Sequence, residues 1–244
     1  MHGGGDDMRI VIAPDVRAVD AAMTEQQSLV ERAFAEPGAA ALFIWRAEQA
    51  LLVTRQDARL PAFERAARVL EAEGWPVLVR TSGGGAFPVH PGTVQFAAAA
   101  RLPAAGRSID AIYDALGAPL IEALASFGVA AGLGEVAGAF CRGRHDIVAG
   151  GRKLGGLAQH WRSTNDGAAR IFAGASVLAE EAAQNLTDVV NRFYTLAGGD
   201  FRCAAGTVTS LRRELGAAAP TGDLAAALLQ RAATVFRSHI PLAA

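Results

Sequence analysis

The sequence predicts an α+β fold in which a mixed or antiparallel sheet is flanked by helices. Its short apolar runs come in adjacent pairs, as in antiparallel hairpins, and segments with apolar residues at helical spacing precede and follow them. The chain contains no G-x-G-x-x-G run, and residues 150–154 lack the spacing of a phosphate-binding P-loop. These observations favour paired strands with flanking helices over a doubly wound nucleotide-binding fold.

The first third of the chain predicts two helices with a pair of strands between them. Apolar residues at helical spacing indicate a helix over 15–35. Two apolar runs, 41–45 and 51–54, are separated by a short, mostly polar segment and predict a hairpin. A second helix is expected over 61–73, with a proline in its first turn and a glycine after its last residue.

The middle of the chain predicts a special loop between two strands. A short buried strand at 77–80 runs into the glycine-rich segment 81–85, and a further strand is expected at 94–100. Ser108 is expected to cap a helix that extends to about residue 127, with Gly117 and Pro119 interrupting it. The remaining expected elements are a hairpin of 146–149 with 153–161, a strand at 170–178, and helices at 180–194, 208–215 and 223–239.

Composition narrows the class of protein. The 244 residues are 51% hydrophobic and 19% charged, which predicts a single domain over 1–244 with about eight disordered residues at its start. A formal charge of -1 without a basic run argues against nucleic acid or an anionic membrane as partner. No apolar run is long enough to span a membrane, and two cysteines without zinc-type spacing indicate a cytoplasmic protein with no metal site.

The single lysine is a candidate catalytic residue. Of the 23 basic residues, 22 are arginine and one is Lys153, and a lysine supplies a compact charge where arginine supplies a wide fork. Gly155 and Gly156 follow it in a predicted strand, where glycines indicate the close approach of a ligand or of another backbone. An ammonium there would bind an acyl carbonyl oxygen or stabilise an oxyanion. The alternative is a chance surface lysine.

The glycine-rich segment is a candidate binding loop. In the run 80–86, the missing side chains of Gly83, Gly84 and Gly85 let backbone N–H groups converge on a ligand's oxygen atoms, while Arg80 supplies charge and Ser82 a hydroxyl. Such a nest suits a carboxylate, a phosphate or a thioester oxygen. The alternative is a hairpin loop that needs glycine only for positive φ.

Cys141 is a candidate nucleophile because three basic or titratable residues follow it closely, an environment that favours a thiolate. If the glycine pair at 150–151 forms a two-residue turn, Lys153 pairs with Val148, and Cys141 would lie opposite His160. The segment 141–144 must then fold back to reach the lysine. An inert buried cysteine is the alternative.

Other titratable residues give weaker signals. Cys203 is the rival nucleophile, because it precedes a helix expected to begin near Thr207 and helix N-termini lower thiol pKa values. His90, His145 and His160 are isolated in the sequence. Each is expected to be a surface or hydrogen-bonding residue rather than a general base.

Two segments resemble the signatures of a known superfamily. Residues 80–86 and 151–159 resemble the two motifs of the lipoate-protein ligase A, octanoyltransferase and biotin ligase superfamily. Residues 42–46, 55–56 and 206–211 also look like the corresponding segments of lipoate-protein ligase. The resemblance implies the lipoate/biotin protein ligase type of catalytic domain, without a C-terminal accessory domain.

Within that superfamily, the Cys-x-Gly-x-x-Asp run at 141–146 is most similar to the cysteine-dependent octanoyl and lipoyl transferases. The resemblance implies that Cys141 forms an acyl thioester and that Lys153 contacts the acyl group. The residues that it implies for binding the acyl group are Arg55, Arg80, Ser82, Gly83, Gly84, Gly85, Gly155, Gly156 and Ala158.

The implied activity is transfer of an octanoyl or lipoyl group to a lysine of a lipoyl domain, without a cofactor. The donor would be an acyl carrier protein or a protein of the glycine-cleavage H type. One alternative is a ligase that uses ATP and Mg to form a lipoyl-adenylate, with Cys141 structural. The histidine pair that often follows the lysine strand in ligases is replaced by residues 171–174. A non-catalytic lipoate-binding homologue is the other alternative.

Overall fold

The computed structural model describes residues 8–35, 40–102, 108–182 and 185–239. Disorder was expected for about the first eight residues. Residues 1–7 lie outside the described range, and Met8 begins a strand. Within the described residues, no helix combines the length and the apolar character needed to cross a bilayer.

A seven-stranded sheet forms the centre of the molecule. Its strands in spatial order are β1 (Met8–Arg17), β2 (Ala40–Ala47), β6 (Thr93–Leu102), β10 (Ala169–Leu178), β9 (Arg152–Ser163), β8 (Asp146–Ala149) and β7 (Ala131–Gly134). β1 and β2 are parallel, and every other neighbouring pair is antiparallel. The mixed sheet predicted from the sequence is confirmed.

A second sheet of three strands has the order β4 (Val77–Arg80), β3 (Ala50–Thr54) and β5 (Phe87–Val89). The hairpin predicted for 41–45 and 51–54 is therefore wrong, because these strands lie in different sheets. β2 is buried over nearly its whole length and needs partners on both edges, which β1 and β6 supply. Continuous apolar runs predict strands but not which strands pair.

The described residues form six α-helices beside the sheets: α1 (Val19–Ala35), α2 (Phe63–Ala72), α3 (Ile109–Ala125), α4 (Leu186–Ala197), α5 (Leu211–Leu215) and α6 (Leu224–His239). Short 3₁₀ helices span Asp57–Arg59 and Gly216–Ala218. α3 begins at the predicted cap, because Ser108 Oγ accepts a hydrogen bond from the Ala111 N–H.

Several predicted boundaries are wrong for local reasons. The helix predicted from residue 15 starts at Val19, because 15–17 still belong to β1. The helices predicted from 180 and 208 start later, where Asn185 and Ser210 cap them. Residues 183–184 of the predicted helix lie outside the described range.

α3 is continuous across Gly117 and Pro119, where an interruption was predicted. At Gly117 a Cβ would lie 3.0 Å from Leu133 Cδ1, so the glycine allows α3 to pack closely on β7. The strands β1, β5 and β7 were not predicted. β1 carries Pro14 at an irregularity of an edge strand, and β5 and β7 have only three and four residues.

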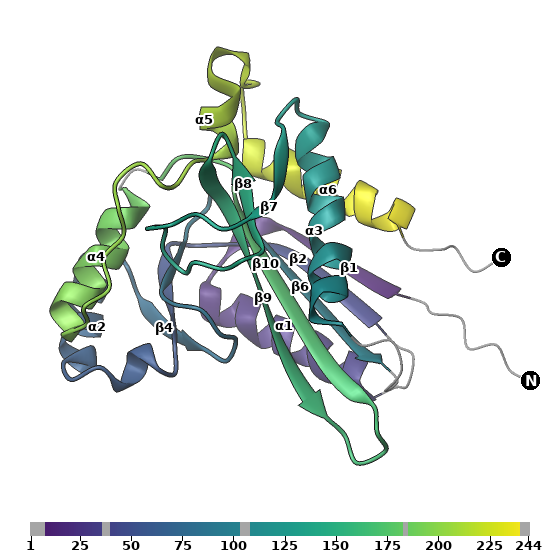
Figure 1. The fold of residues 1–244 in the computed structure, drawn as a ribbon, viewed down its shortest axis with the longest axis horizontal. Coiled ribbons are helices and arrows are strands. Elements are labelled where there is room, and N and C mark those ends of the chain that lie inside the picture. The colour runs from purple at the N-terminus through teal and green to yellow at the C-terminus, as the bar shows by residue number, and fades with distance from the viewer. Residues whose placement is uncertain (1–7, 36–39, 103–107, 183–184, 240–244) are drawn as a thin grey trace, which may run out of the picture.

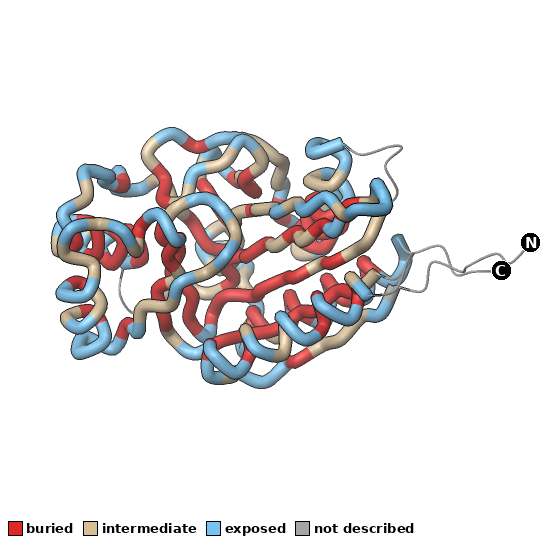
Figure 2. Tube along the Cα trace, turned by 90° about the horizontal axis from the view of Figure 1, so that it is seen from below, coloured by how far each residue is buried: buried red, intermediate tan, exposed pale blue. Residues whose placement is uncertain are grey.

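The two faces of the large sheet have different cover. α3 and α6 pack together over one face, on Leu42, Ile44 and Phe96. α1 and the small sheet, with α2 and α4, cover the other face, where Phe43 and Trp45 belong to the shared core. Figure 1 shows α2, α4 and β4 grouped at one end of the molecule, and Figure 2 shows buried residues running along the central strands. The candidate site lies on this second face, between the two sheets.

Candidate active site

The glycine-rich loop joins β4 to β5, and both strands pair with β3, so the two ends of the loop are held on one strand. Arg80, the last residue of β4, donates side-chain hydrogen bonds to two residues of the loop. Its Nη1 donates to Ser82 Oγ at 2.5 Å, and its Nη2 donates to the Gly85 carbonyl oxygen at 2.9 Å. The guanidinium therefore fixes the shape of the loop.

Cys141 lies against this loop although more than fifty residues separate them in the sequence. Its Sγ accepts hydrogen bonds from Arg80 Nη2 and from the Gly85 N–H, each at 3.4 Å. Among the described residues, Cys141 is the only one other than glycine with positive φ, at 43°. A non-glycine residue in this conformation costs about 1–3 kcal/mol and persists only where the surroundings hold it.

Gly84 is required by the position of the sulfur. Its φ is 108°, and a Cβ at this residue would lie 2.5 Å from Cys141 Sγ. At Gly85 a Cβ would lie 3.1 Å from Tyr194 Oη, whereas Gly83 has open space around it. The close approach of Cys141 thus explains one of the three consecutive glycines directly.

Lys153 contacts the backbone of Cys141 and is fully buried, with 0% exposure. Its Nζ donates to the carbonyl oxygens of Phe140 and Cys141 at 3.0 and 2.6 Å and to Asp146 Oδ1 at 2.9 Å. Burial raises the pKa of Asp146 even though the lysine beside it works in the opposite direction.

The predicted hairpin of β8 and β9 is confirmed, including the pairing of Lys153 with Val148. Cys141 does not lie opposite His160, because β8 begins only at Asp146. The chain before Asp146 instead curls back over the lysine, and this places the two candidate catalytic residues side by side.

Tyr194 and Asp57 support the loop and were not predicted from the sequence. Tyr194 Oη accepts from the Ala86 N–H at 3.0 Å and donates to Asp57 Oδ1 at 2.9 Å. Asp57 Oδ2 in turn accepts from the N–H and hydroxyl of Thr54. Burial raises the pKa of the Tyr194 phenol. The Thr-x-x-Asp turn at 54–57 was a local signal for this contact, but its tyrosine partner lies too far along the chain to be inferred.

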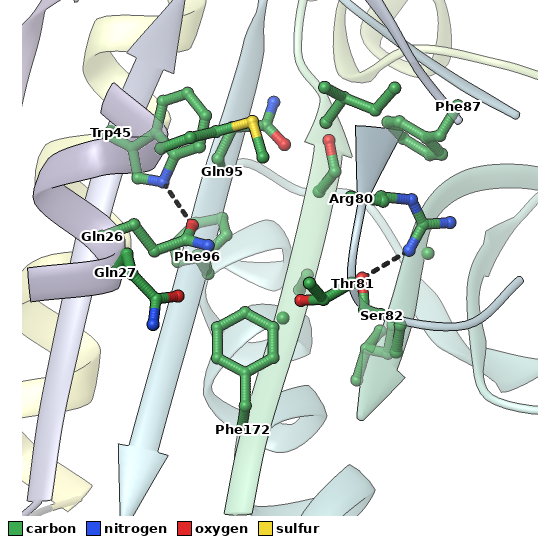
Figure 3. Close-up of a pocket in the computed structure, with 18 of the residues that line it drawn as sticks. Gln26, Gln27, Trp45, Arg80, Thr81, Ser82, Phe87, Gln95, Phe96 and Phe172 are labelled. Atoms are coloured by element: carbon green, nitrogen blue, oxygen red, sulfur yellow. Dashed lines mark hydrogen bonds between the residues drawn. The ribbon is translucent and has the colours of Figure 1, made fainter. Parts of the chain in front are cut away.

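A cavity of about 550 Å³ opens beside Cys141, between α1, the large sheet and the glycine loop. Five large apolar side chains on this side of the large sheet line it: Met23, Trp45, Leu52, Phe87 and Phe172. Figure 3 shows Gln26 and Gln27 of α1 near Trp45 on one side of the cavity and Arg80, Ser82 and Phe87 on the other. A cavity of this size with a largely apolar lining and polar groups on two sides suits a small ligand with an aliphatic part.

One row of paired residues crosses the sheet beneath the cavity. Trp45 pairs with Gln95, Gln95 with Ser176, and Ser176 with Gly156 on β9. All four residues line the cavity, and directly paired residues present their side chains to the same face. The cavity thus extends across four strands from the end near Cys141.

The predicted binding residues separate into four groups. Arg80, Ser82, Gly156 and Ala158 line the cavity together with Cys141. Gly84 and Gly85 lie against Cys141, as described above, whereas Gly83 has open surroundings and Arg55 is exposed and is not part of the lining. Gly155 is buried, and a Cβ there would lie 2.5 Å from the Ser176 carbonyl oxygen, so the close neighbour of this glycine is the backbone of β10.

The rival nucleophile has a different environment from the one predicted. Cys203 is buried, and the next helix begins only at Leu211, so the sulfur does not lie at a helix N-terminus. Burial raises the pKa of its thiol to about 12. Of the described histidines, His90 is buried, and desolvation lowers its pKa to about 4, whereas His160 is exposed.

No three described His, Cys, Asp or Glu side chains gather as a metal-binding group.

Comparison with known proteins gives a consistent result. The family model described as the lipoyl protein ligase A/B catalytic domain matches residues 19–233. The chain is 32% identical over 210 residues to an uncharacterized protein of Cupriavidus necator, a match that covers 81% of this chain and 83% of that one. It is 29% identical over 211 residues to an octanoyl-GcvH:protein N-octanoyltransferase of Kyrpidia tusciae, which covers 83% of this chain and 72% of the relative.

Among solved structures, the chain is similar to a crystal structure of lipoate-protein ligase A bound with ATP. The TM-score is 0.67 at 13% identity, and the match covers 96% of this chain and 86% of the other. At this identity the likeness shows the fold, and it confirms the predicted type of catalytic domain.

We predict that replacing Gly155 by Ala destabilises the protein. The added methyl group has no room against the Ser176 carbonyl, and overpacking of this kind costs about 1–3 kcal/mol. Thermal unfolding should show a melting temperature lower by about 2–4 °C for each kcal/mol. Gly132→Ala is the matched control, because it is also a strand glycine but has no atom within 4 Å of the added Cβ. Equal melting temperatures for the two variants would contradict the close packing of Gly155 on the backbone of β10.

We also predict that iodoacetamide at pH 8 alkylates Cys141 at least about tenfold faster than Cys203 in the folded protein. Cys141 is half-buried and lines the cavity, whereas the raised pKa of Cys203 keeps that thiol neutral at this pH. Peptide mass spectrometry after timed quenching measures both rates, with the urea-unfolded chain as the control in which the difference should disappear. Faster labelling of Cys203 would reverse the assignment of the accessible thiol.

Proposed function

The chain belongs to the lipoyl protein ligase A/B catalytic-domain family, and on that basis we propose that it transfers an octanoyl or lipoyl group to a lysine of a lipoyl domain. The transfer proceeds through a thioester on Cys141. The observation that carries the proposal is the position of this sulfur, which lies at the edge of an apolar cavity and faces two N–H donors. The name of the Kyrpidia tusciae relative supports the same reaction class.

In the first step, Cys141 Sγ attacks the carbonyl carbon of the donor's acyl group. The C–S bond forms, the bond from the carbonyl carbon to the donor's nitrogen or sulfur breaks, and the departing atom takes the thiol proton. The donor is an acylated carrier protein, either an acyl carrier protein or a protein of the glycine-cleavage H type.

In the second step, the amine of the acceptor lysine attacks the thioester. The C–N bond of the new amide forms, the C–S bond breaks, and the sulfur takes a proton from the amine. Bonds, protons and charge balance over the two steps, so the transfer consumes no ATP and no redox partner.

The cavity supplies the site for the acyl chain. Its aromatic and aliphatic lining removes the chain from water, and each buried methylene contributes about 0.8 kcal/mol. Arg80 and Gly85 stay beside the reacting sulfur, where their N–H groups can hold its negative charge. Binding and chemistry thus use opposite ends of one cavity.

The ligase alternative requires a place for a triphosphate. Of the described residues that line the cavity, Arg80 alone is basic, and its guanidinium already bonds Ser82, Gly85 and Cys141. The cavity therefore offers a triphosphate no further basic side chain. The transferase is therefore the function that the geometry favours.

The test is the mass of the intact protein after incubation with an octanoylated carrier protein in the absence of ATP. We expect one added octanoyl group on the wild type, removed by neutral hydroxylamine, because that reagent cleaves thioesters. Cys141→Ser should carry no adduct, and Cys203→Ser should carry it as the wild type does.

Two results would contradict this function. Exchange of pyrophosphate into ATP that depends on lipoate or octanoate, without an adduct, would establish the ligase. Tight binding of lipoate with neither an adduct nor exchange would establish a binding protein without catalysis.

A further inference from the structure

The ammonium group of Lys153 has no free proton for a ligand. An ammonium has three N–H donors, and Lys153 uses them on the carbonyl oxygens of Phe140 and Cys141 and on Asp146. The side chain is fully buried and is not among the residues that line the cavity. An acyl carbonyl would have to displace one of these three acceptors to reach it.

Two of the three acceptors lie on either side of one Cα atom. The carbonyl of Phe140 belongs to the peptide group that precedes the Cys141 Cα, and the carbonyl of Cys141 belongs to the one that follows it. Because peptide groups are planar, holding both of them fixes φ and ψ of the residue between them. Cys141 is the residue that adopts the unfavourable left-handed conformation.

Asp146 extends this contact to the rest of the loop. Its Oδ1 accepts from Lys153, and its Oδ2 accepts from the Gly143 N–H at 3.1 Å. Gly156 leaves room for the ammonium, because a Cβ there would lie 3.1 Å from Nζ. The pair therefore ties the segment from Phe140 to Asp146 to strand β9.

We propose that Lys153 and Asp146 are positioning residues that hold Cys141 in its left-handed conformation, with Sγ aimed at Arg80 and Gly85, and that Lys153 does not contact the acyl group. The proposal rests on the role of Cys141 as the nucleophile. It differs from the contact between this lysine and the acyl group that the family resemblance implies.

The test separates the reactivity of the thiol from binding of the acyl chain. At each pH from 7 to 9, we expect iodoacetamide to alkylate Cys141 at least tenfold more slowly in Lys153→Met than in the wild type. Octanamide has an acyl chain but no leaving group that the thiol displaces readily, and its dissociation constant should stay within twofold of the wild type. For acyl transfer, kcat should fall at least tenfold while KM for the acylated carrier stays within twofold.

The matched control is Arg152→Met, which removes a cation from the neighbouring residue, whose partner is Glu214. Alkylation of Cys141 in this variant should match the wild type. Lys153→Met leaves Asp146 buried without its cation, so the double variant Lys153→Met with Asp146→Asn is measured as well. The double variant removes both charges, but the carbonyl groups of Phe140 and Cys141 still lack their hydrogen-bond donor. We therefore expect alkylation of Cys141 to be as slow as in Lys153→Met.

The opposite pattern overturns the proposal. If Lys153 contacts the acyl group, alkylation in both Lys153 variants will equal that of the wild type, and octanamide binding will weaken at least tenfold. Alkylation and octanamide binding do not depend on transfer. If the wild type transfers no acyl group, the proposed function is contradicted. The role of Lys153 is still decided by the alkylation rate and by octanamide binding.

Discussion

The burial of one ammonium group is the constraint on which the candidate site depends. A charged group removed from water is tolerated only where hydrogen bonds and an opposite charge replace its hydration, and Lys153 obtains these from Asp146 and two consecutive carbonyl groups. Its own backbone pairs with the segment around Val208, through hydrogen bonds to Thr207 and Thr209. Four parts of the chain therefore meet at this residue, and one of them carries the candidate nucleophile.

The other half of the site depends on close backbone approach. The sulfur of Cys141 fits beside the glycine loop only because Gly84 has no side chain, and the loop keeps its shape through Arg80 and the contact of Ala86 with Tyr194. The two-sheet architecture places this loop on the same face of the large sheet as α1, and a cavity lined by aromatic residues lies between them. A rigid reactive group next to a preformed apolar cavity is what transfer of an aliphatic acyl group requires.

Local patterns in the sequence predicted the parts of this arrangement that local forces determine. The pair Gly150 and Gly151 gave the turn of the β8–β9 hairpin, and with it the position of Lys153 opposite Val148. The contact of Cys141 with Gly85 joins residues 56 apart, and that of Tyr194 with Asp57 joins residues 137 apart, so no spacing rule reaches them. The separation of β2 from β3 escaped prediction because apolar runs do not specify their partners.

The central claim is that the thioester on Cys141 lies on the reaction path. The most direct measurement isolates the acylated protein, mixes it with an unmodified lipoyl domain and no ATP, and follows the loss of the acyl group from the protein within a single turnover. We predict that the acyl group appears on the acceptor lysine at a rate at least equal to kcat of the complete reaction. An acylated protein that keeps its acyl group in the presence of the lipoyl domain, or passes it to the acceptor lysine more slowly than the complete reaction turns over, would contradict this reaction path.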